Sequence, residues 1–470
     1  MSIQKERAIN FIEHDWEENI IPALSDYITI PCLSPEFDKD WERNGFIDEA
    51  MKQLETWVQN QGIRGLSCEI LKLPGKTPVL FIEVDSSEKT SVFFYGHIDK
   101  QPQATGWDEG LHPFKAVRKG SKLYGRGSVD DGYALFCALS SIKALQDQGL
   151  SHPRCVIFIE SCEESGSYDL PDYLEILKDR IGTPDIMICL DSGCGNYESL
   201  WLTTSLRGAV IGTLRVNILE KGVHSGEASG IIPSSFRIIR SLLSRLEDEK
   251  TGEILLKECH VEIPEDRQKQ IKQTAEILGV GVYDHFPLVK GARPMSEDES
   301  ILLLNETWKP ILSITGVEGI PPLEQAGNVL RPFTSLKLSL RLPPTCDPVK
   351  AGVALKEILE QNAPYGARVQ FDLELPLEGW NAPTFSSSFS DSVNEASKKY
   401  FGREVCYLGM GGSIGFMKLF AEKYPNAQFM VTGALGPQSN AHGPNEALDI
   451  PTAKKLTCCL TEIVGGFVKA

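Results

Sequence analysis

The chain has 470 residues, more than one ordinary hydrophobic core holds, and its 41% hydrophobic and 24% charged content is typical of a globular protein. Its 47 basic and 64 acidic residues give a formal charge of −17, which argues against a nucleic-acid surface because such a surface needs a basic stripe. The apolar runs are far shorter than the roughly 20 residues of a spanning helix, and the charged N-terminus lacks a signal-peptide core. The twelve cysteines form no CxxC pair, so we expect reduced thiols in a cytoplasmic protein.

The first 200 residues alternate between short β-type runs and helical stretches. A helix is expected over Tyr133–Gln148, where apolar residues recur every three to four positions. Strands are expected at Val79–Val84, Ser91–Tyr95, Cys155–Glu160 and Ile186–Leu190. A late strand in Asn426–Gly433 and a closing helix from Thr452 repeat this pattern. Such alternation predicts an α/β fold with a mainly parallel sheet covered by helices.

The middle of the chain has a different pattern. Apolar and polar residues alternate with a period of two in Thr334–Leu342 and Arg368–Leu375, as in strands with one buried face. Helical stretches are expected at Ser234–Leu246 and Val349–Gln361. We therefore predict an inserted α+β domain over residues 205–377. The catalytic-type domain is then discontinuous, with a first part at 1–204 and a second part at 378–470.

Potential metal ligands follow the expected strands. They are His97 and Asp99, the pair Asp130 and Asp131 before the long helix, the doublet Glu163 and Glu164, Asp191, and His442. The carboxyl ends of strands in open α/β sheets line the ligand crevice, so these groups can converge. Histidines and carboxylates without cysteine suit zinc, cobalt or manganese. In the doublet, one acid can bind metal while its neighbour takes a proton from water; the alternative is a loop of solvated acids.

Several short motifs together resemble the M20 metallopeptidases, and within them the carnosinase-like dipeptidases. These are "YGHIDKQP", "GWDEGLHPF", "KLYGRGSVDDG", "CEESGS", "LDSG", "GVHSG", "SLRLP", "GGSIG" and "AHGPNE", in the family order from about residue 90 to 450. The resemblance implies metal-dependent hydrolysis of an amide or peptide bond in a small carboxylate-bearing substrate. The expected activity is that of a dipeptidase, with an N-acyl amino acid deacylase such as succinyl-diaminopimelate desuccinylase as the alternative.

The resemblance also implies a role for each candidate residue in a site with two divalent metal ions. Zinc is expected, with manganese or cobalt as alternatives. The five implied ligands are His97 and Asp191 for one ion, Glu164 and His442 for the other, and Asp130 as the bridge. Glu163 would be the general base, and Asp99 would orient His97. A cis peptide bond is implied at Asp130–Asp131.

Further residues would bind the substrate, again by resemblance. His224 would reach the reacting carbonyl from the partner subunit of a homodimer formed through the inserted dimerisation or lid domain. Arg341 could grip a carboxylate bidentately, and backbone N–H groups at Gly412 and Ser413 could cradle one. We expect no nucleic-acid or membrane partner. Gly132 departs from the family pattern D-x-K-G, which puts any one relative's substrate preference in doubt.

A second class of enzyme also fits part of the sequence. Residues 411–415 form a G-x-S-x-G segment between a β-type run and a helix, as in the nucleophile elbow of α/β-hydrolases. Ser413 would then be the nucleophile and His442 the base. The chain order requires an acid between them, and Glu422, inside an expected helix, is the one available.

Overall fold

The computed structural model describes residues 3–374, 376–412 and 415–468. The chain forms two compact units. Unit 1 contains residues 1–204, 382–408 and 419–470, and unit 2 contains residues 205–381 and 409–418. The domain bounds expected from the sequence, and the dimerisation or lid role of the inserted domain, stay predictions.

Unit 1 is built on a six-stranded sheet with the strand order β1-β2-β6-β3-β7-β17. The strands are β1 (Leu66–Leu71), β2 (Val79–Val84), β3 (Ser91–His97), β6 (Arg154–Glu160), β7 (Ile186–Cys189) and β17 (Gln428–Val431). The pairs β3/β6, β3/β7 and β7/β17 are parallel, while β1/β2 and β2/β6 are antiparallel. The mainly parallel sheet is confirmed, and its antiparallel edge was not predicted.

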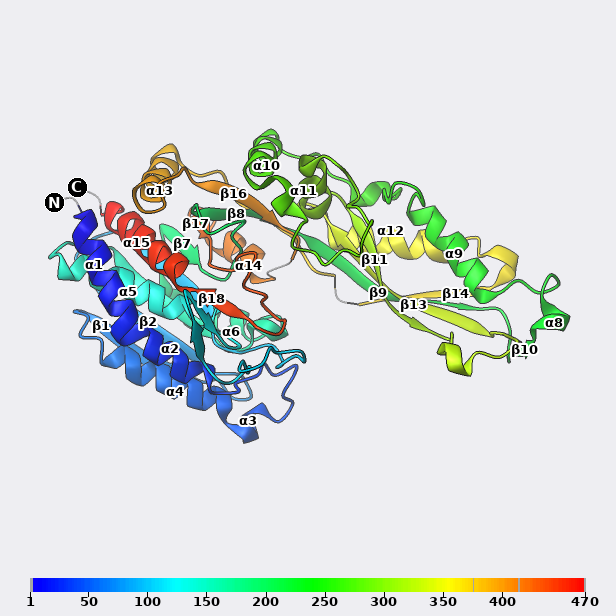
Figure 1. The fold of residues 1–470 in the computed structure, drawn as a ribbon, viewed down its shortest axis with the longest axis horizontal. Helices are drawn as coiled ribbons and strands as arrows, with labels where there is room; N and C mark the ends of the chain where they lie inside the picture. The colour runs from blue at the N-terminus through cyan, green and yellow to red at the C-terminus, as the bar shows by residue number, and fades with distance from the viewer. Residues whose placement is uncertain (1–2, 375, 413–414, 469–470) are drawn as a thin grey trace. The chain divides into compact units, whose positions relative to one another are not determined.

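Helices cover both faces of this sheet. They are α1 (Lys5–Asp15), η1 (Trp16–Ile20), α2 (Ile21–Ile28), α3 (Trp41–Asn44), α4 (Phe46–Gln59), α5 (Ala134–Asp147), η2 (Glu163–Ser165), α6 (Leu170–Ile176), α7 (Lys178–Ile181), α13 (Ser387–Tyr400), α14 (Phe416–Lys423) and α15 (Ile450–Gly466). Helices α1, α5 and α15 pack together on one side (Figure 1). Phe94 of β3 belongs to the core on that side, whereas Phe93 contacts Phe420 of α14. Successive strand residues point to opposite faces, so β3 is buried on both.

A small sheet in unit 1 brings two distant loops together. Its strands are β4 (Val117–Lys119), β5 (Lys122–Tyr124) and β18 (Ala447–Asp449), in the order β18-β5-β4. Ala447 pairs with Tyr124 in the antiparallel register of β18 and β5. The residues just after β5 therefore lie beside the residues just before β18, although more than 300 positions separate them in sequence.

Unit 2 contains a four-stranded antiparallel sheet in the order β11-β13-β9-β14. Its strands and two short ones are β9 (Gly208–Asn217), β10 (Val223–His224), β11 (Ile311–Glu318), β12 (Val329–Leu330), β13 (Phe333–Leu342) and β14 (Arg368–Leu373). Its helices are α8 (Ser225–Ala228), α9 (Ser235–Leu246), η3 (Lys257–Cys259), α10 (Glu265–Leu278), η4 (Gly279–Val282), α11 (Glu299–Thr307), η5 (Leu323–Gln325), α12 (Pro348–Glu360) and η6 (Pro364–Gly366). One sheet face packs on α9 and α12, so the alternating leucines of β13 form a buried core.

A further sheet contains β8 (Trp201–Leu206), β15 (Trp380–Asn381) and β16 (Cys406–Met410).

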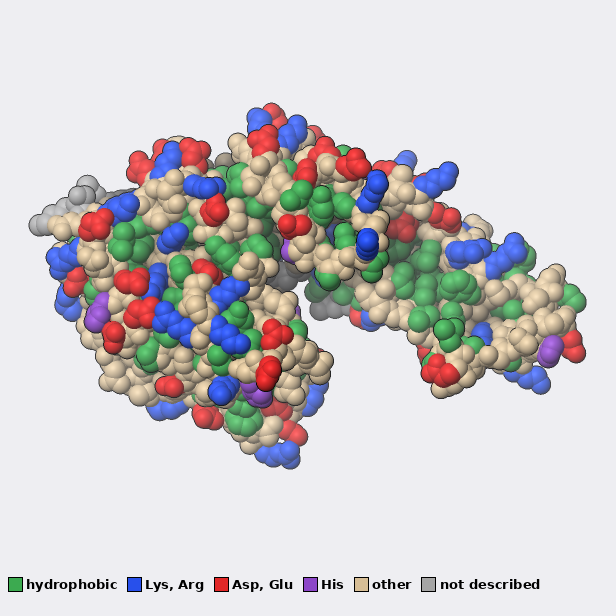
Figure 2. Space-filling view, in the orientation of Figure 1, with side chains coloured by type: hydrophobic (Ala, Val, Ile, Leu, Met, Phe, Trp, Pro, Cys, Tyr) green, Lys and Arg blue, Asp and Glu red, His purple; other side chains and the backbone are tan. Residues whose placement is uncertain are grey.

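The surface carries charges of both signs. Acidic and basic side chains are interspersed over the visible face in Figure 2. Among the described residues, no helix is long and apolar enough to cross a membrane. All twelve cysteines are free.

Candidate metal centre

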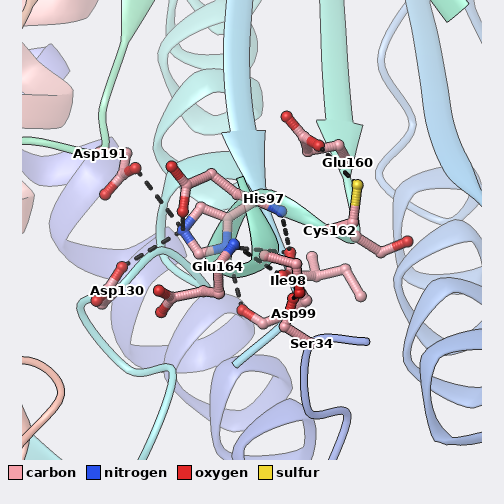
Figure 3. A network of polar contacts seen from close by, with 12 residues as sticks. Ser34, His97, Ile98, Asp99, Asp130, Glu160, Cys162, Glu164 and Asp191 are labelled. Atoms are coloured by element: carbon pink, nitrogen blue, oxygen red, sulfur yellow. Dashed lines mark hydrogen bonds and ion pairs between the residues drawn. The ribbon is translucent and has the colours of Figure 1, made fainter. Parts of the chain in front are cut away.

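His97 is the last residue of β3 and is almost completely buried. Its Nδ1 lies 3.1 Å from the backbone oxygen of Asp99 and 3.4 Å from the Asp99 Oδ1. These contacts fix the ring orientation and direct Nε2 toward Asp130 and Asp191 (Figure 3). Among the described residues Nε2 has no hydrogen-bond partner, although it is buried. A buried imidazole nitrogen aimed at two carboxylates is suited to ligate a metal ion.

Asp130 lies in the loop between β5 and α5, and the Asp130–Asp131 peptide bond is cis, as the resemblance implies. The loop is tightly packed at Gly132, against Gly127 of the same loop and Tyr27 of α2. A Cβ atom on Gly132 would lie 2.3 Å from the Gly127 carbonyl oxygen and 2.4 Å from a ring carbon of Tyr27. No side chain fits there, so the packing of this loop requires glycine at position 132, where the pattern D-x-K-G has lysine.

The remaining acids come from the ends of neighbouring strands. Glu163 and Glu164 begin η2, directly after β6, and Asp191 follows β7. His442 lies in the loop before β18 with a positive φ of 63°. Strands β3, β6 and β7 are adjacent and parallel, so their carboxyl ends deliver His97, the two glutamates and Asp191 to one edge of the sheet, and the loop before β18 adds His442.

Five side chains form two groups that share Asp130. In the first position, His97 Nε2 lies 3.4 Å from Asp130 Oδ1 and 3.7 Å from Asp191 Oδ2. In the second position, His442 Nε2 lies 2.9 Å from Asp130 Oδ2 and 3.4 Å from Glu164 Oε2. The ligand atoms within each group all lie within 4.8 Å of one another. Nitrogen and carboxylate oxygen donors at this spacing fit two divalent cations bridged by one carboxylate.

The side chains of this cluster perturb each other's pKa values. Burial would lower the pKa of His97, but Asp130 raises it well above its ordinary value. Burial would raise the pKa of Asp130, but contacts with His442 and His97 hold it below its usual range. Burial and then Asp130 raise the pKa of Glu164 to about 8, burial raises that of Asp191 to about 6, and Asp130 raises that of His442 to about 9. Glu164 and Asp191 therefore resist ionisation, a cost that bound cations would offset.

Glu163 belongs to neither ligand group. Its Oε2 lies 4.0 Å from His97 Nε2, and its side chain is 16% exposed. Burial and then the neighbouring Asp191 raise its pKa well above the ordinary value. The geometry therefore separates the two members of the doublet: Glu164 lies in the second position, and Glu163 stands beside the first.

Asp99 does more than orient His97. Its fully buried carboxylate accepts hydrogen bonds from the backbone N–H of Glu163 at 3.1 Å and of Glu164 at 3.0 Å. One aspartate thus fixes both the histidine of the first position and the turn that presents the glutamates. The contact with His97 was expected from the sequence, and the contacts with the two backbone N–H groups were not.

Three further residues near the cluster were missed from the sequence. Gln101 donates from Nε2 to Glu164 Oε2 at 2.6 Å. Arg126 and Glu446 form an ion pair of 2.5 Å whose side chains are at most 1% exposed. All three lie inside motif segments quoted above, "YGHIDKQP", "KLYGRGSVDDG" and "AHGPNE". Their polar side chains within otherwise matched motifs were the available signal.

The expected substrate residues lie in unit 2. His224 ends β10, is exposed, and accepts the Gly226 N–H on Nδ1 at 3.1 Å. Arg341 is half-buried on β13, opposite Ala209 of β9. Gly412 is exposed, and its carbonyl accepts the Arg207 N–H at 3.1 Å. Ser413 lies outside the described residues. Their roles stay predictions.

Comparisons with known proteins agree with this geometry. The model of peptidase family M20/M25/M40 matches residues 93–465. The Cys-Gly metallodipeptidase DUG1 of Saccharomyces cerevisiae is 26% identical over 453 residues, with 91% of each chain covered. The Beta-Ala-His dipeptidase of Mus musculus is 28% identical over 390 residues, or 79% of this chain and 76% of the relative.

A solved structure of the di-peptidase Dug1p from Saccharomyces cerevisiae has a TM-score of 0.76 and 22% identity, with complete coverage of both chains. That likeness shows a shared fold. The family match covers every residue of the two ligand groups. The chain therefore belongs to peptidase family M20/M25/M40.

Proposed function

We propose that this protein is a metal-dependent dipeptidase that uses two divalent ions, zinc in the first instance and manganese or cobalt as alternatives. The observation that carries the proposal is the pair of ligand groups that share Asp130. The relatives named above are dipeptidases by name, which supports a dipeptide over an N-acyl amino acid as substrate. The deacylase alternative is therefore not favoured.

His97, Asp130 and Asp191 would hold one ion, and Asp130, Glu164 and His442 the other. When bound, the two ions polarise the scissile carbonyl and increase the acidity of an attacking water. Glu163 stands beside the first group without belonging to either, so we propose that it takes the proton from water and delivers it to the leaving amine. Asp99 holds the Glu163 backbone through its N–H, which keeps the base in position.

The same proposal assigns the substrate contacts to unit 2 of a homodimer. His224 would donate to the oxyanion of the partner's site, and Arg341 with the Gly412 backbone would bind the substrate carboxylate. The surface around His224 supports a contact with a second copy. It carries exposed apolar side chains, including Ile231 at 78% and Tyr365 at 67%, beside a cavity of about 310 Å³.

Two copies with different defects test the homodimer. His224→Ala and Glu163→Gln subunits are each expected to be nearly inactive. If His224 acts on the partner's site, a mixed dimer has one site with both residues intact. Its activity should then be about half that of a wild-type dimer. No recovery in verified mixed dimers, or a fully active monomer, would refute the shared site.

The rival serine-hydrolase interpretation has a direct test. We expect a metal chelator to abolish hydrolysis of a dipeptide panel, and a serine-directed phosphonate to have no effect. N-succinyl and N-acetyl amino acids, assayed in parallel, are expected to react much more slowly than dipeptides. Inhibition by the phosphonate alone would favour Ser413 as nucleophile, and faster turnover of the acylated amino acids would make the enzyme a deacylase.

The free cysteines bear on where the enzyme works. None of the twelve is paired, and eleven are buried. We propose a cytoplasmic enzyme, since thiols stay reduced in that compartment.

A further inference from the structure

The loops that carry Asp130 and His442 are joined by one buried ion pair, Arg126 with Glu446. Both side chains are at most 1% exposed. Arg126 lies four residues before Asp130, and Glu446 lies four residues after His442. The pair therefore connects two of the three segments that supply ligands to the second position, and neither Arg126 nor Glu446 is itself a ligand.

Each member of the pair also binds the backbone of the opposite loop. Arg126 Nη2 donates to the carbonyl oxygens of His442 at 2.9 Å and Gly443 at 3.0 Å. Glu446 Oε1 accepts the N–H of Gly127 at 2.9 Å and of Val129 at 3.3 Å. The contacts are reciprocal: the arginine of one loop fixes the metal-bearing turn of the other, and the glutamate does the same in return.

The His442 loop needs such support because its backbone is unusual. Asn440, His442 and Asn445 all have positive φ values, of 48°, 63° and 63°. Residues other than glycine adopt this region at a cost, and surrounding contacts must hold them there. His442 is also the most exposed of the five ligands, with 56% of its side chain accessible. Packing of the side chain therefore restrains it little, and the bonds from Arg126 add a restraint on its backbone to the bond from the Gly443 N–H to the Asn440 carbonyl.

We propose that the Arg126–Glu446 pair is a positioning device for the second metal position: it sets the distance between Asp130 and His442, and it affects the first position only through the shared Asp130. The first position shares Asp130, but its other two ligands, His97 and Asp191, come from the ends of β3 and β7, whose parallel pairing involves neither member of the pair. Disrupting the pair should therefore weaken one metal-binding step selectively. This inference rests on the proposed dinuclear site.

The experiment is a titration of metal-free protein with Zn²⁺ in which calorimetry measures the heat of each binding step. In the wild type we expect two steps, and His442→Ala identifies the step of the second position by removing it. Arg126→Lys keeps a positive charge but replaces the planar fork, which reaches Glu446 through Nη1 and the two carbonyls through Nη2, by donors that all leave from one nitrogen atom. We expect it to weaken the second step by about 10–100-fold, the usual effect of removing support from a metal ligand, and to change the first step less than about threefold.

A matched control is Arg154→Lys. Arg154 begins β6, pairs with Glu83 at 2.6 Å and donates to the carbonyl of Ile181, so it combines an ion pair with backbone bonds far from the ligands. It should leave both steps unchanged. If Arg126→Lys does not fold, the double variant Arg126→Met/Glu446→Met removes both charges together and leaves no unpaired ion.

The outcomes separate the inference from the proposed function. Selective loss of the second step supports the positioning role. Equal loss of both steps, or two unchanged steps in a folded variant, overturns it while the dinuclear site stands. A wild-type protein that binds fewer than two ions overturns both.

Discussion

The change Asp99→Asn tests how one buried carboxylate organises the metal centre. Asp99 accepts two backbone N–H groups, from Glu163 and Glu164, and lies 3.4 Å from His97 Nδ1. Asparagine offers one acceptor oxygen, so its amide N–H₂ must face an N–H donor. A hydrogen bond to a charged group contributes about 1.5–3 kcal/mol, so losing one and weakening the other should cost about 2–4 kcal/mol of unfolding free energy.

The loss should also reach the metals, because Asp99 orients His97 and the Glu164 backbone. We expect the affinity for Zn²⁺ to fall by about 10–100-fold, measured by competition with a chelating dye, with urea unfolding measured in parallel on metal-free protein. Asp169→Asn is a matched control. Asp169 is a 4% exposed carboxylate that accepts the Thr77 N–H at 3.0 Å, and it belongs to neither ligand group.

The two variants should lose similar stability, and only Asp99→Asn should lose metal affinity. If Asp99→Asn is destabilised but binds Zn²⁺ as the wild type does, Asp99 is a structural residue and its assigned support of the ligands is wrong.

Further changes test other parts of the account. Glu163→Gln should keep both metals in elemental analysis, while its turnover should fall by about 10²–10⁴-fold or more. A fully active variant would exclude Glu163 as the general base. Gly132→Ala should lower the free energy of unfolding by about 1–3 kcal/mol through overpacking against the Gly127 carbonyl and Tyr27, whereas Gly281→Ala, with no atom within 4 Å, should not; equal effects would contradict this. Hydrogen bonds from Arg118, then Lys454, lower the pKa of Glu17 to about 2 from 4.5. The stability that ionised Glu17 gives the folded protein is therefore present above pH 4.5 and lost as the pH falls toward 2. Glu17→Gln should cost at most about 1 kcal/mol at pH 7, after allowance for solvent screening, and the difference from wild type in urea unfolding should shrink below pH 4.5; a constant difference would refute the ion-pair origin.

Local patterns predicted the central strands well. The run Ser91–Tyr95 is apolar at every position but its first, which indicates a strand buried on both faces, and β3 is such a strand. The alternation of Thr334–Leu342 predicted β13 with one residue of difference at its start. The antiparallel direction of β2 was not predictable in this way, since a buried strand has the same apolar sequence pattern whether its neighbours are parallel or antiparallel.

The residues of the site also differ in how far the sequence could predict them. Ligand candidates follow strands and carry chemistry that their residue types reveal, so His97 and Asp191 could be proposed from position alone. Arg126 and Glu446 could not be paired, because 320 positions separate them and only the register of β5 with β18 brings their loops together. The second role of Asp99 was hidden for a related reason: its partners are backbone N–H groups, which every sequence contains.

The sharing of Asp130 between two metal positions is tested most directly by titrating metal-free Asp130→Asn with Zn²⁺ beside the wild type and His442→Ala. We predict two binding steps in the wild type, loss of the second step alone in His442→Ala, and weakening of both steps together in Asp130→Asn, because Asp130 offers Oδ1 to the first position and Oδ2 to the second. Two undiminished steps in a folded Asp130→Asn protein, or full dipeptide hydrolysis by wild-type protein freed of metal, would contradict it.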